Sequence, residues 1–151
     1  MLKGIDPLLT PELLKVLAEM GHGDEIVVAD ANFTAVSLAR GKPVLRLPGV
    51  GVARACDAVL SVLLLDAAVA QPVVFMQVGD TPPGYRSALQ REVIDKLRSR
   101  GDAQPAQCEA IERFAFYRRV EGAFAIVQTG ELEPWGNFLF KKGVIADALR
   151  P

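Results

Sequence analysis

The chain has 151 residues, of which half are apolar and fewer than a quarter are charged, and its formal net charge is −1. This size and composition predict one globular domain over residues 1–151, and a near-neutral charge argues against nucleic-acid binding. Cys56 and Cys108 have no metal or redox spacing, so we expect two reduced thiols in a cytoplasmic protein. Residues 58–65 form the most apolar run, which is far too short to cross a membrane, and polar residues near the start argue against a signal peptide.

The first predicted helix begins at Thr10 and continues to Met20. A threonine N-cap, a proline at the first helical position and an acid in the first turn favour this start. We expect Gly21 to end the helix in the left-handed conformation. His22, the only histidine, would then lie beside unpaired helix carbonyls and the negative end of the helix dipole. Such surroundings favour an imidazolium that donates a proton near neutral pH.

A short strand is predicted at residues 26–29, where an apolar, β-branched run is typical of a strand buried on both faces. Asp30 follows directly, at the carboxyl end of the strand, where open α/β sheets place ligand-binding groups. A plainer interpretation makes His22 a surface turn residue and Asp30 a cap of the next segment. Both interpretations stand on these residues alone.

The middle of the chain predicts two further strands, at residues 43–47 and 73–78, separated by a largely buried helix over residues 52–65. Asp66 would be an acid at the end of that helix, where the helix dipole disfavours a negative charge. This misfit makes Asp66 a secondary site candidate. The glycines in residues 49–51 lack the third glycine of a dinucleotide-binding loop and predict a turn.

The rest of the chain predicts a helix that continues to Arg100 and stops at Gly101, followed by strands at residues 123–127 and 137–141. Helices and buried strands in this order indicate one α/β sandwich with a mainly parallel sheet. The large apolar share and the sheet edges of such a small domain also suggest an oligomer.

Residues 111–119 combine aromatic and basic side chains in a predicted amphipathic helix. RNA stacking is one interpretation, but a single short helix in an acidic protein is weak evidence for it. Phe114 and Tyr117, three positions apart, are more simply a pair that faces the core.

The sequence contains no nucleophile elbow, paired cysteines, Walker loop or two-histidine metal spacing. A metal site made of His22, Asp24, Glu25 and Asp30 is conceivable, but one histidine with hard carboxylates is a weak metal pattern. One histidine, a few carboxylates, an arginine and a tyrosine suit proton transfer around a polar, neutral substrate. We therefore expect no metal and no cofactor.

Several short segments also form a recognisable set that spans nearly the whole chain. They are residues 11–14, 21–25, 30–33, 113–117, 123–127, 129–131, 136–137 and 141–143. Each is weak alone, but together they resemble the L-fucose mutarotase and D-ribose pyranase family of sugar anomer-converting proteins. The resemblance is stronger toward the fucose branch.

This resemblance implies a single three-layer α/β/α domain, often assembled as stacked pentameric rings, and a monosaccharide substrate. We therefore expect a homo-oligomer, pentameric or decameric. The implied activity interconverts the α and β anomers of a free aldose without a cofactor. Arg113 falls where the fucose branch has arginine and the ribose branch has histidine, which makes L-fucose the expected sugar.

The resemblance also implies roles for individual residues. His22 matches the proton donor and Asp30 a sugar-binding acid, while Asp66 and Tyr117 match site positions of animal fucose mutarotases. Trp135-Gly136-Asn137 matches a Tyr-Gly-Asn segment that contacts the sugar. In this assignment Arg113, Asp66, Trp135, Gly136 and Asn137 join Asp30 in binding the sugar, and Tyr117 or a site water accepts the second proton.

Two positions depart from the family pattern: Trp135 replaces a tyrosine, and Thr34 replaces a common proline. The loss of the tyrosine hydroxyl bears on which sugar is bound more than on the reaction.

The position of the first strand predicts that the site is shared between subunits. His22 precedes this strand and Asp30 follows it, eight residues later, so an extended chain keeps them too far apart for one sugar ring. Either the chain folds back sharply at Gly23, or a neighbour supplies part of each pocket. Residues 135–137 are the candidate segment that crosses over.

The main alternative is a non-catalytic cytoplasmic sugar-binding protein linked to transport or regulation, which needs the same hydrogen-bonding pocket. A titratable donor such as His22 favours the enzyme, because a binding protein has no use for one. A metal-dependent hydrolase is a second alternative and would require a bound metal.

Overall fold

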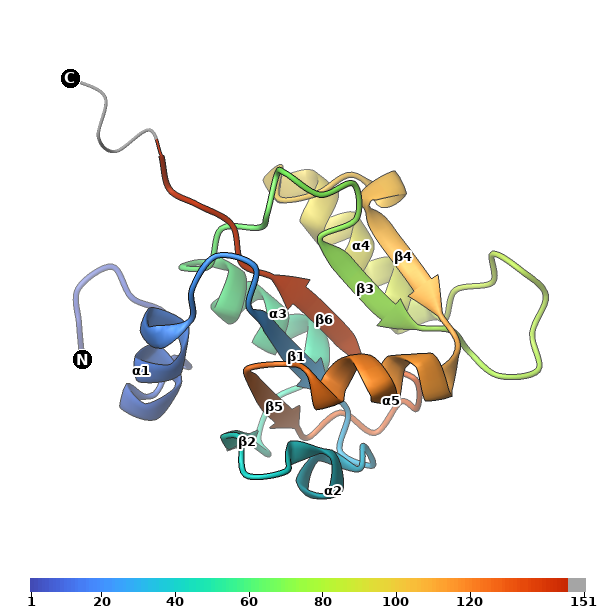
Figure 1. Ribbon diagram of the computed structural model, residues 1–151, viewed down its shortest axis with the longest axis horizontal. Coiled ribbons are helices and arrows are strands. Elements are labelled where there is room, and N and C mark those ends of the chain that lie inside the picture. Colours follow the sequence, from blue (N-terminus) through green and yellow to red (C-terminus); the bar gives the residue numbers. More distant parts are fainter. Residues whose placement is uncertain (147–151) are drawn as a thin grey trace.

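Figure 1 shows the computed structural model of the protein, which describes residues 1–146. The strands are β1 (Glu25–Ala29), β2 (Val44–Leu47), β3 (Val73–Met76), β4 (Cys108–Ile111), β5 (Ala125–Thr129) and β6 (Phe138–Lys141). The helices are α1 (Pro11–Glu19), α2 (Ala35–Ala39), α3 (Val52–Leu60), α4 (Ala88–Arg100) and α5 (Arg113–Glu121), with a 3-10 turn η1 (Pro105–Gln107).

The six strands form one sheet in the order β2-β5-β1-β6-β3-β4. Among the strands of residues 1–146, β6 alone runs antiparallel to its neighbours, β1 and β3, and the other pairings are parallel. The arrows in Figure 1 show β6 pointing against β1, β3 and β4. The predicted α/β fold with a mainly parallel sheet is thus confirmed, and the start of β6 lies beside the carboxyl ends of β1 and β3.

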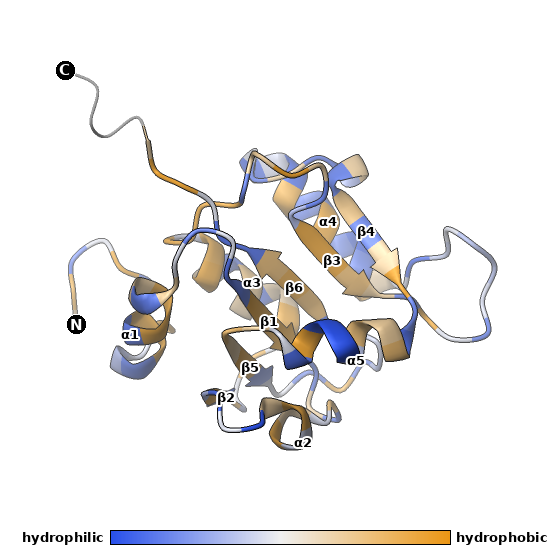
Figure 2. Cartoon of the chain, in the orientation of Figure 1, coloured by the Kyte–Doolittle hydropathy of each residue, from blue (hydrophilic) through white to orange (hydrophobic). Residues whose placement is uncertain are grey.

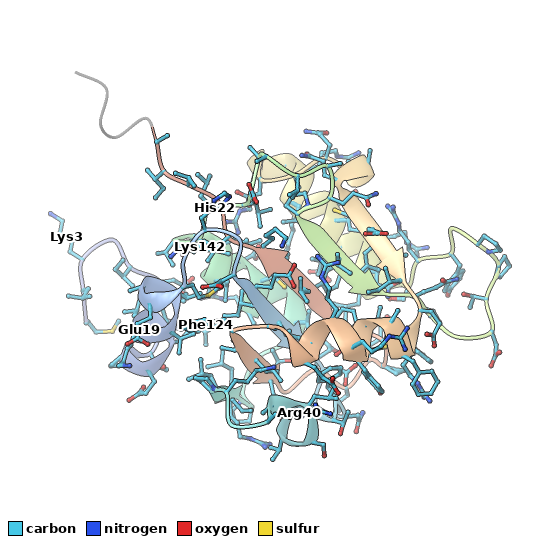
Figure 3. All side chains as sticks on the ribbon, in the orientation of Figure 1. Lys3, Glu19, His22, Arg40, Phe124 and Lys142 are labelled. Atoms are coloured by element: carbon cyan, nitrogen blue, oxygen red, sulfur yellow. The ribbon has the colours of Figure 1, made fainter. Side chains whose placement is uncertain are left out.

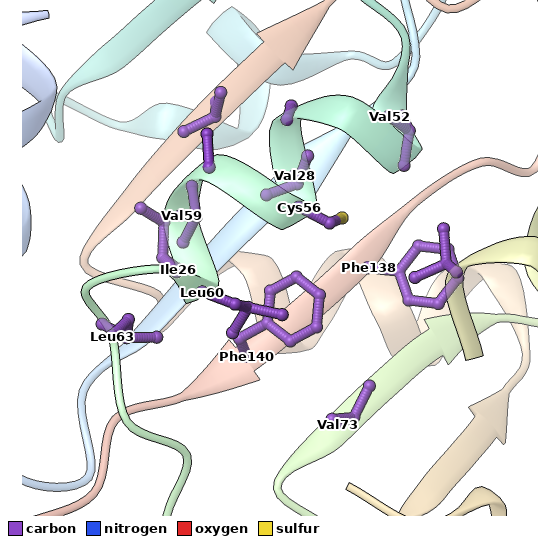
Figure 4. Packing of buried hydrophobic residues seen from close by; sticks show 14 of the residues in the cluster. Ile26, Val28, Val52, Cys56, Val59, Leu60, Leu63, Val73, Phe138 and Phe140 are labelled. Atoms are coloured by element: carbon purple, nitrogen blue, oxygen red, sulfur yellow. The ribbon is translucent and has the colours of Figure 1, made fainter. Parts of the chain in front are cut away.

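Helices cover both faces of the sheet, as the expected three layers require. Alternate side chains of each strand point to opposite faces, so Ile26 and Val28 pack with α1, α3 and α4, while Val27 and Ala29 pack with α2 and α5. The central strands β1, β3 and β6 are apolar along most of their length (Figure 2), and α3 lies directly on Phe140 and its neighbours in β1 (Figure 4). A sheet buried on both faces explains the uninterrupted apolar runs of the sequence.

The predicted helix over residues 52–65 is too long. It ends at Leu60, and the apolar residues that follow run along the end of the sheet, where Leu65 forms an isolated bridge with Lys142. Asp66 therefore does not lie at a helix C-terminus, and the predicted misfit with a helix dipole was wrong.

Two elements were missed. The short helix α2 follows the β1 loop, and the edge strand β4 lies where only a connection to a helix was expected. In β4 the burial is mixed, because an edge strand has one neighbour and less cover, so its residues carry no clear apolar run. The helix that follows starts at Arg113 rather than at Ile111.

The proposed core-facing pair in α5 is half wrong. Tyr117 packs against the core cluster on this face of the sheet, but Phe114 is 54% exposed. The two rings still meet edge to face, with centroids 6.0 Å apart, at the surface of α5.

Candidate active site

His22 lies in the loop that joins α1 to β1, at the amino end of the strand. Met20 is already extended, and the left-handed residue in this loop is Gly23, with φ at 85°, rather than Gly21 as predicted. The N–H of Gly21 donates to Oδ2 of Asp24 at 2.7 Å, which closes the loop from inside. The chain thus turns after His22 and leaves its side chain 53% exposed.

Asp66 is the partner of His22. The Nε2 of His22 lies 3.2 Å from Oδ2 of Asp66, whose side chain is nearly buried. The N–H of Ala68 donates to the other carboxylate oxygen at 2.9 Å, and this bond together with His22 lowers the pKa of Asp66. Asp66 is therefore an ionised carboxylate at neutral pH, a suitable partner for an imidazolium.

The expected influence of the α1 end on His22 is not found. The carbonyls of Leu17 and Met20, which the sequence left unpaired, accept hydrogen bonds from Nζ of Lys142 at 2.8 and 2.6 Å. The negative group next to the imidazole is therefore the Asp66 carboxylate and not the helix terminus.

Asp30 lies at the carboxyl end of β1 and is 3% exposed. Its N–H donates to Oδ1 of Asn137 at 3.0 Å, which joins two predicted site residues, and its own Oδ1 accepts the N–H of Asn32. Burial raises the pKa of Asp30, although these hydrogen bonds partly oppose it. Gln128, which the sequence did not point to, fixes the following loop by donating to the carbonyls of Ala31 and Phe33.

Trp135, two residues before Asn137, adopts a left-handed backbone conformation, with φ at 68°. The fully buried Gln90 holds it there, because Nε2 donates to the carbonyl of Trp135 at 3.1 Å and to that of Met76 at 2.8 Å. The indole ring lies against Gly79, where an added Cβ would come within 3.0 Å of it. The only sequence signal for Gln90 is its place at the third helical position after the N-cap Ser87, where it completes a capping box.

An open pocket of about 390 Å³ lies beside Trp135 and Gly79. It is lined by Gln77, Val78, Gly79, Asp80, Thr81, Glu112, Arg113, Phe114 and Trp135. The guanidinium of Arg113 lies over the rings of Phe114, at 4.6 Å, and Tyr117, at 5.9 Å. The volume falls in the range of small-molecule sites.

The predicted site residues therefore form two groups at opposite ends of the parallel strands. We call these ends the amino edge and the carboxyl edge of the sheet. His22 and Asp66 lie at the amino end of β1, and the second group lies at its carboxyl end. The second group is Asp30, Arg113, Tyr117, Trp135, Gly136 and Asn137. The five residues of β1 separate the groups by roughly 16 Å at strand spacing. The chain does not fold back at Gly23, because β1 runs straight on from the loop in register with β6.

The conceivable metal set does not assemble. Glu25 is bound by Arg119 and Lys141, and within residues 1–146 no three His, Cys, Asp or Glu side chains gather closely enough to hold a metal ion. Cys56 and Cys108 are buried, free thiols, and burial raises the pKa of Cys108 to about 11. None of the helices in this part of the chain has the length and apolar character to span a membrane.

A three-layer α/β domain with a histidine–aspartate pair at one sheet edge and a polar, aromatic pocket at the other defines a protein equipped for proton transfer on a small polar molecule. The sequence profile of the RbsD / FucU transport protein family matches residues 3–145, and the chain belongs to this family.

Named relatives resemble the chain over almost its whole length. It is 43% identical to an L-fucose mutarotase of Actinobacillus pleuropneumoniae, over 95% of this chain and 97% of that protein, and 43% identical to the fucose mutarotase of Homo sapiens, over 96% and 95%. The structure of a fucose mutarotase from Streptococcus pneumoniae in complex with L-fucose superimposes with a TM-score of 0.85 at 35% identity, over 96% of this chain and 100% of that one.

Proposed function

We propose that this protein is an L-fucose mutarotase, an isomerase that interconverts the α and β anomers of the free sugar. The similar proteins that bear this name cover nearly the whole chain. The observation within the molecule that carries the proposal is the pairing of His22 with the ionised Asp66, because an exposed imidazole next to a carboxylate is suited to deliver protons.

The chemistry requires only proton transfers. A pyranose changes anomer when its hemiacetal opens, the aldehyde rotates and the ring closes again. Opening needs a proton on the ring oxygen while another proton leaves the anomeric hydroxyl. In our proposal the His22 imidazolium supplies the first proton, Asp66 orients the ring of His22, and Tyr117 or a water beside it receives the second.

The residues at the carboxyl edge would bind the sugar. Arg113 and Asn137 offer donors and Asp30 an acceptor to sugar hydroxyls, while the Trp135 ring offers an apolar surface. Gly136 keeps the segment compact, because a Cβ there would come within 2.6 Å of Leu89.

We infer that each working site forms between two copies of the chain. A sugar ring cannot reach from His22 to the carboxyl-edge residues of the same chain across β1, so the donor of one copy must face the pocket of another. A ring-shaped homo-oligomer, pentameric or stacked as a decamer, repeats such an interface around its axis. Cytoplasmic location stays a prediction.

Saturation-transfer NMR of anomer exchange tests the proposed reaction. L-fucose is measured with and without protein, beside D-ribose and D-galactose at equal concentration. We expect clear acceleration for L-fucose and less for D-ribose. Equal exchange rates with and without protein for all three sugars would refute the proposal.

A protein that only binds sugar is the second candidate, since the family is described as a transport protein family. The same NMR measurement distinguishes a mutarotase from a protein that only binds sugar. Shifts in sugar signals without faster exchange would establish binding alone, whereas transfer of saturation between anomers requires ring opening.

A further inference from the structure

We propose that Lys142 is a positioning residue for the reaction: it fixes the His22 loop against both α1 and the Asp66 segment. The inference rests on the proposed role of His22 as proton donor. His22 and Lys142 lie near each other beside α1 in Figure 3, although 120 positions separate them in the chain.

The His22 loop needs an external support. Glycines flank His22 on both sides, and the imidazole is half exposed, with Asp66 as its hydrogen-bond partner. Glycine backbones are freer than others, so side-chain packing alone does not hold such a loop in one conformation. A proton donor works only within a narrow range of distance and orientation, and a displacement of 1 Å is costly.

The backbone of Lys142 joins the two halves of the His22–Asp66 pair. On one side, its carbonyl accepts the N–H of Gly23 and its N–H donates to Asp24, both at 2.8 Å. On the other side, Leu65 pairs with Lys142 as an isolated bridge, and the N–H of Asp66 donates to the preceding carbonyl, that of Lys141, at 3.0 Å. This one segment after β6 therefore sets where both members of the pair lie.

The side chain of Lys142 also connects the His22 loop to the end of α1. Its ammonium donates to the carbonyls of Leu17, in the last turn of α1, and of Met20, the C-cap residue that leads into the loop. Without that ammonium, these carbonyls at the end of α1 would have to turn toward water, and Met20 would lose its tie to the sheet. The neighbouring Lys141 adds a longer bond, at 3.3 Å, to the carbonyl of Gly23.

Lys42 makes a matched comparison elsewhere in the molecule. Its ammonium donates to the carbonyls of Val120 and Glu121 at the end of α5, both at 2.7 Å. Both lysines therefore bind two carbonyls at a helix C-terminus, but only Lys142 binds the residues that lead into the His22 loop. Loss of a helix cap is common to both variants, and loss of the loop support is specific to one.

The test compares Lys142→Met with Lys42→Met in the full-length protein. We expect Lys142→Met to lower kcat for L-fucose exchange by about 10- to 100-fold, with KM within about twofold, because the sugar-binding groups lie at the other sheet edge. Lys42→Met should leave both constants unchanged. Lys142→Arg keeps a charged multiple donor and should recover most of the lost kcat.

The single histidine supplies a direct readout in the absence of sugar. The imidazole NMR signals belong to His22 alone, and we expect them to shift and broaden in Lys142→Met but not in Lys42→Met. If Lys142→Met does not fold, Lys142→Gln, which keeps a donor for one carbonyl, is judged by the same criteria.

Unchanged imidazole signals in the folded Lys142 variant would overturn the positioning role, as would an equal loss of kcat in both methionine variants. A wild-type protein without exchange activity would refute the proposed function instead. In that case the imidazole signals alone decide whether Lys142 holds the loop.

Discussion

The two edges of the sheet are built differently. At the amino edge, His22 is half exposed on a loop between glycines, and its partner Asp66 follows an irregular segment. At the carboxyl edge, Asp30 and Asn137 are each 3% exposed, and the N–H of Asp30 donates a hydrogen bond to Oδ1 of Asn137. In the proposed shared site, the exposed edge presents the proton donor to a substrate held by another copy, and the buried edge recognises that substrate. The two halves of the proposed site thus lie at opposite ends of β1 within one chain, which is why we propose that a second copy completes each site.

Removal of the imidazole should have the largest effect. His22→Ala is expected to slow anomer exchange by about 100- to 10,000-fold, the usual contribution of a general acid. The fold should persist, because the side chain is half exposed. Saturation-transfer NMR measures the rate and circular dichroism checks the fold, with Lys3→Ala as an exposed control. A folded His22→Ala protein with wild-type rate would remove the amino edge from the mechanism.

The ion cluster around the buried Glu25, at the start of β1, should be the most sensitive point for stability. Glu25 is bound by Arg119 at 2.6 Å and Lys141 at 3.0 Å, so Glu25→Gln leaves two cations uncompensated and should cost about 3 kcal/mol of unfolding free energy. The exposed pair of Lys15 and Glu19 provides the control, since Glu19→Gln should cost less than about 0.5 kcal/mol. Equal urea midpoints for the two variants would contradict this account.

The same cluster predicts a pH dependence. Burial by itself would raise the pKa of Glu25, but the bonds from Arg119 and Lys141 outweigh it, and the net pKa is lowered. A lowered pKa in the folded state means that Glu25 stabilises the protein above its unfolded pKa, about 4.3, and that this contribution is lost as pH falls through the folded value. Urea unfolding between pH 3 and 7 should show a shallower acid decline in Glu25→Gln than in wild type.

At the carboxyl edge, Trp135→Ala should weaken sugar binding more than it slows chemistry. We expect KM for L-fucose to rise about 10-fold, a loss of about 1.4 kcal/mol, because the ring forms one wall of the pocket. Tyr85→Ala, which removes an exposed ring outside this pocket, should leave KM unchanged. A drop in kcat at constant KM would instead place Trp135 in the proton chemistry.

Asp30→Asn should change stability less than Glu25→Gln does, and with the opposite sign. Burial raises its pKa, so the folded state binds the proton more tightly than the unfolded state, and the charged form lowers stability above the folded pKa. Asp30→Asn should therefore raise the unfolding free energy at pH 7 by about 1 kcal/mol and weaken L-fucose binding. Thermal unfolding and sugar titration measure both, and a less stable Asp30→Asn would contradict the assigned burial cost.

The sequence predicted the layers and most strands, because runs such as Val73–Met76 carry the signature of burial on both faces. It missed β4, because an edge strand carries no such apolar run. It also made α3 too long, because the apolar residues after Leu60 fit a buried helix as well as a segment that packs along the end of the sheet. The structure places the predicted site residues at the two ends of β1, and their roles in binding and catalysis stay predictions. The pairing of His22 with Asp66, 44 positions apart, depends on where Lys141 and Lys142 return in β6 and its extension, which no local pattern encodes.

Subunit mixing tests the shared site most directly. His22→Ala and Asn137→Ala proteins, each inactive alone, are combined in equal amounts under conditions that let subunits exchange. If the donor of one copy faces the pocket of the next, random mixing restores roughly one quarter of the sites, and anomer exchange of L-fucose should return to about that fraction of the wild-type rate. A mixture that exchanges subunits but stays inactive would show that each site lies within one chain.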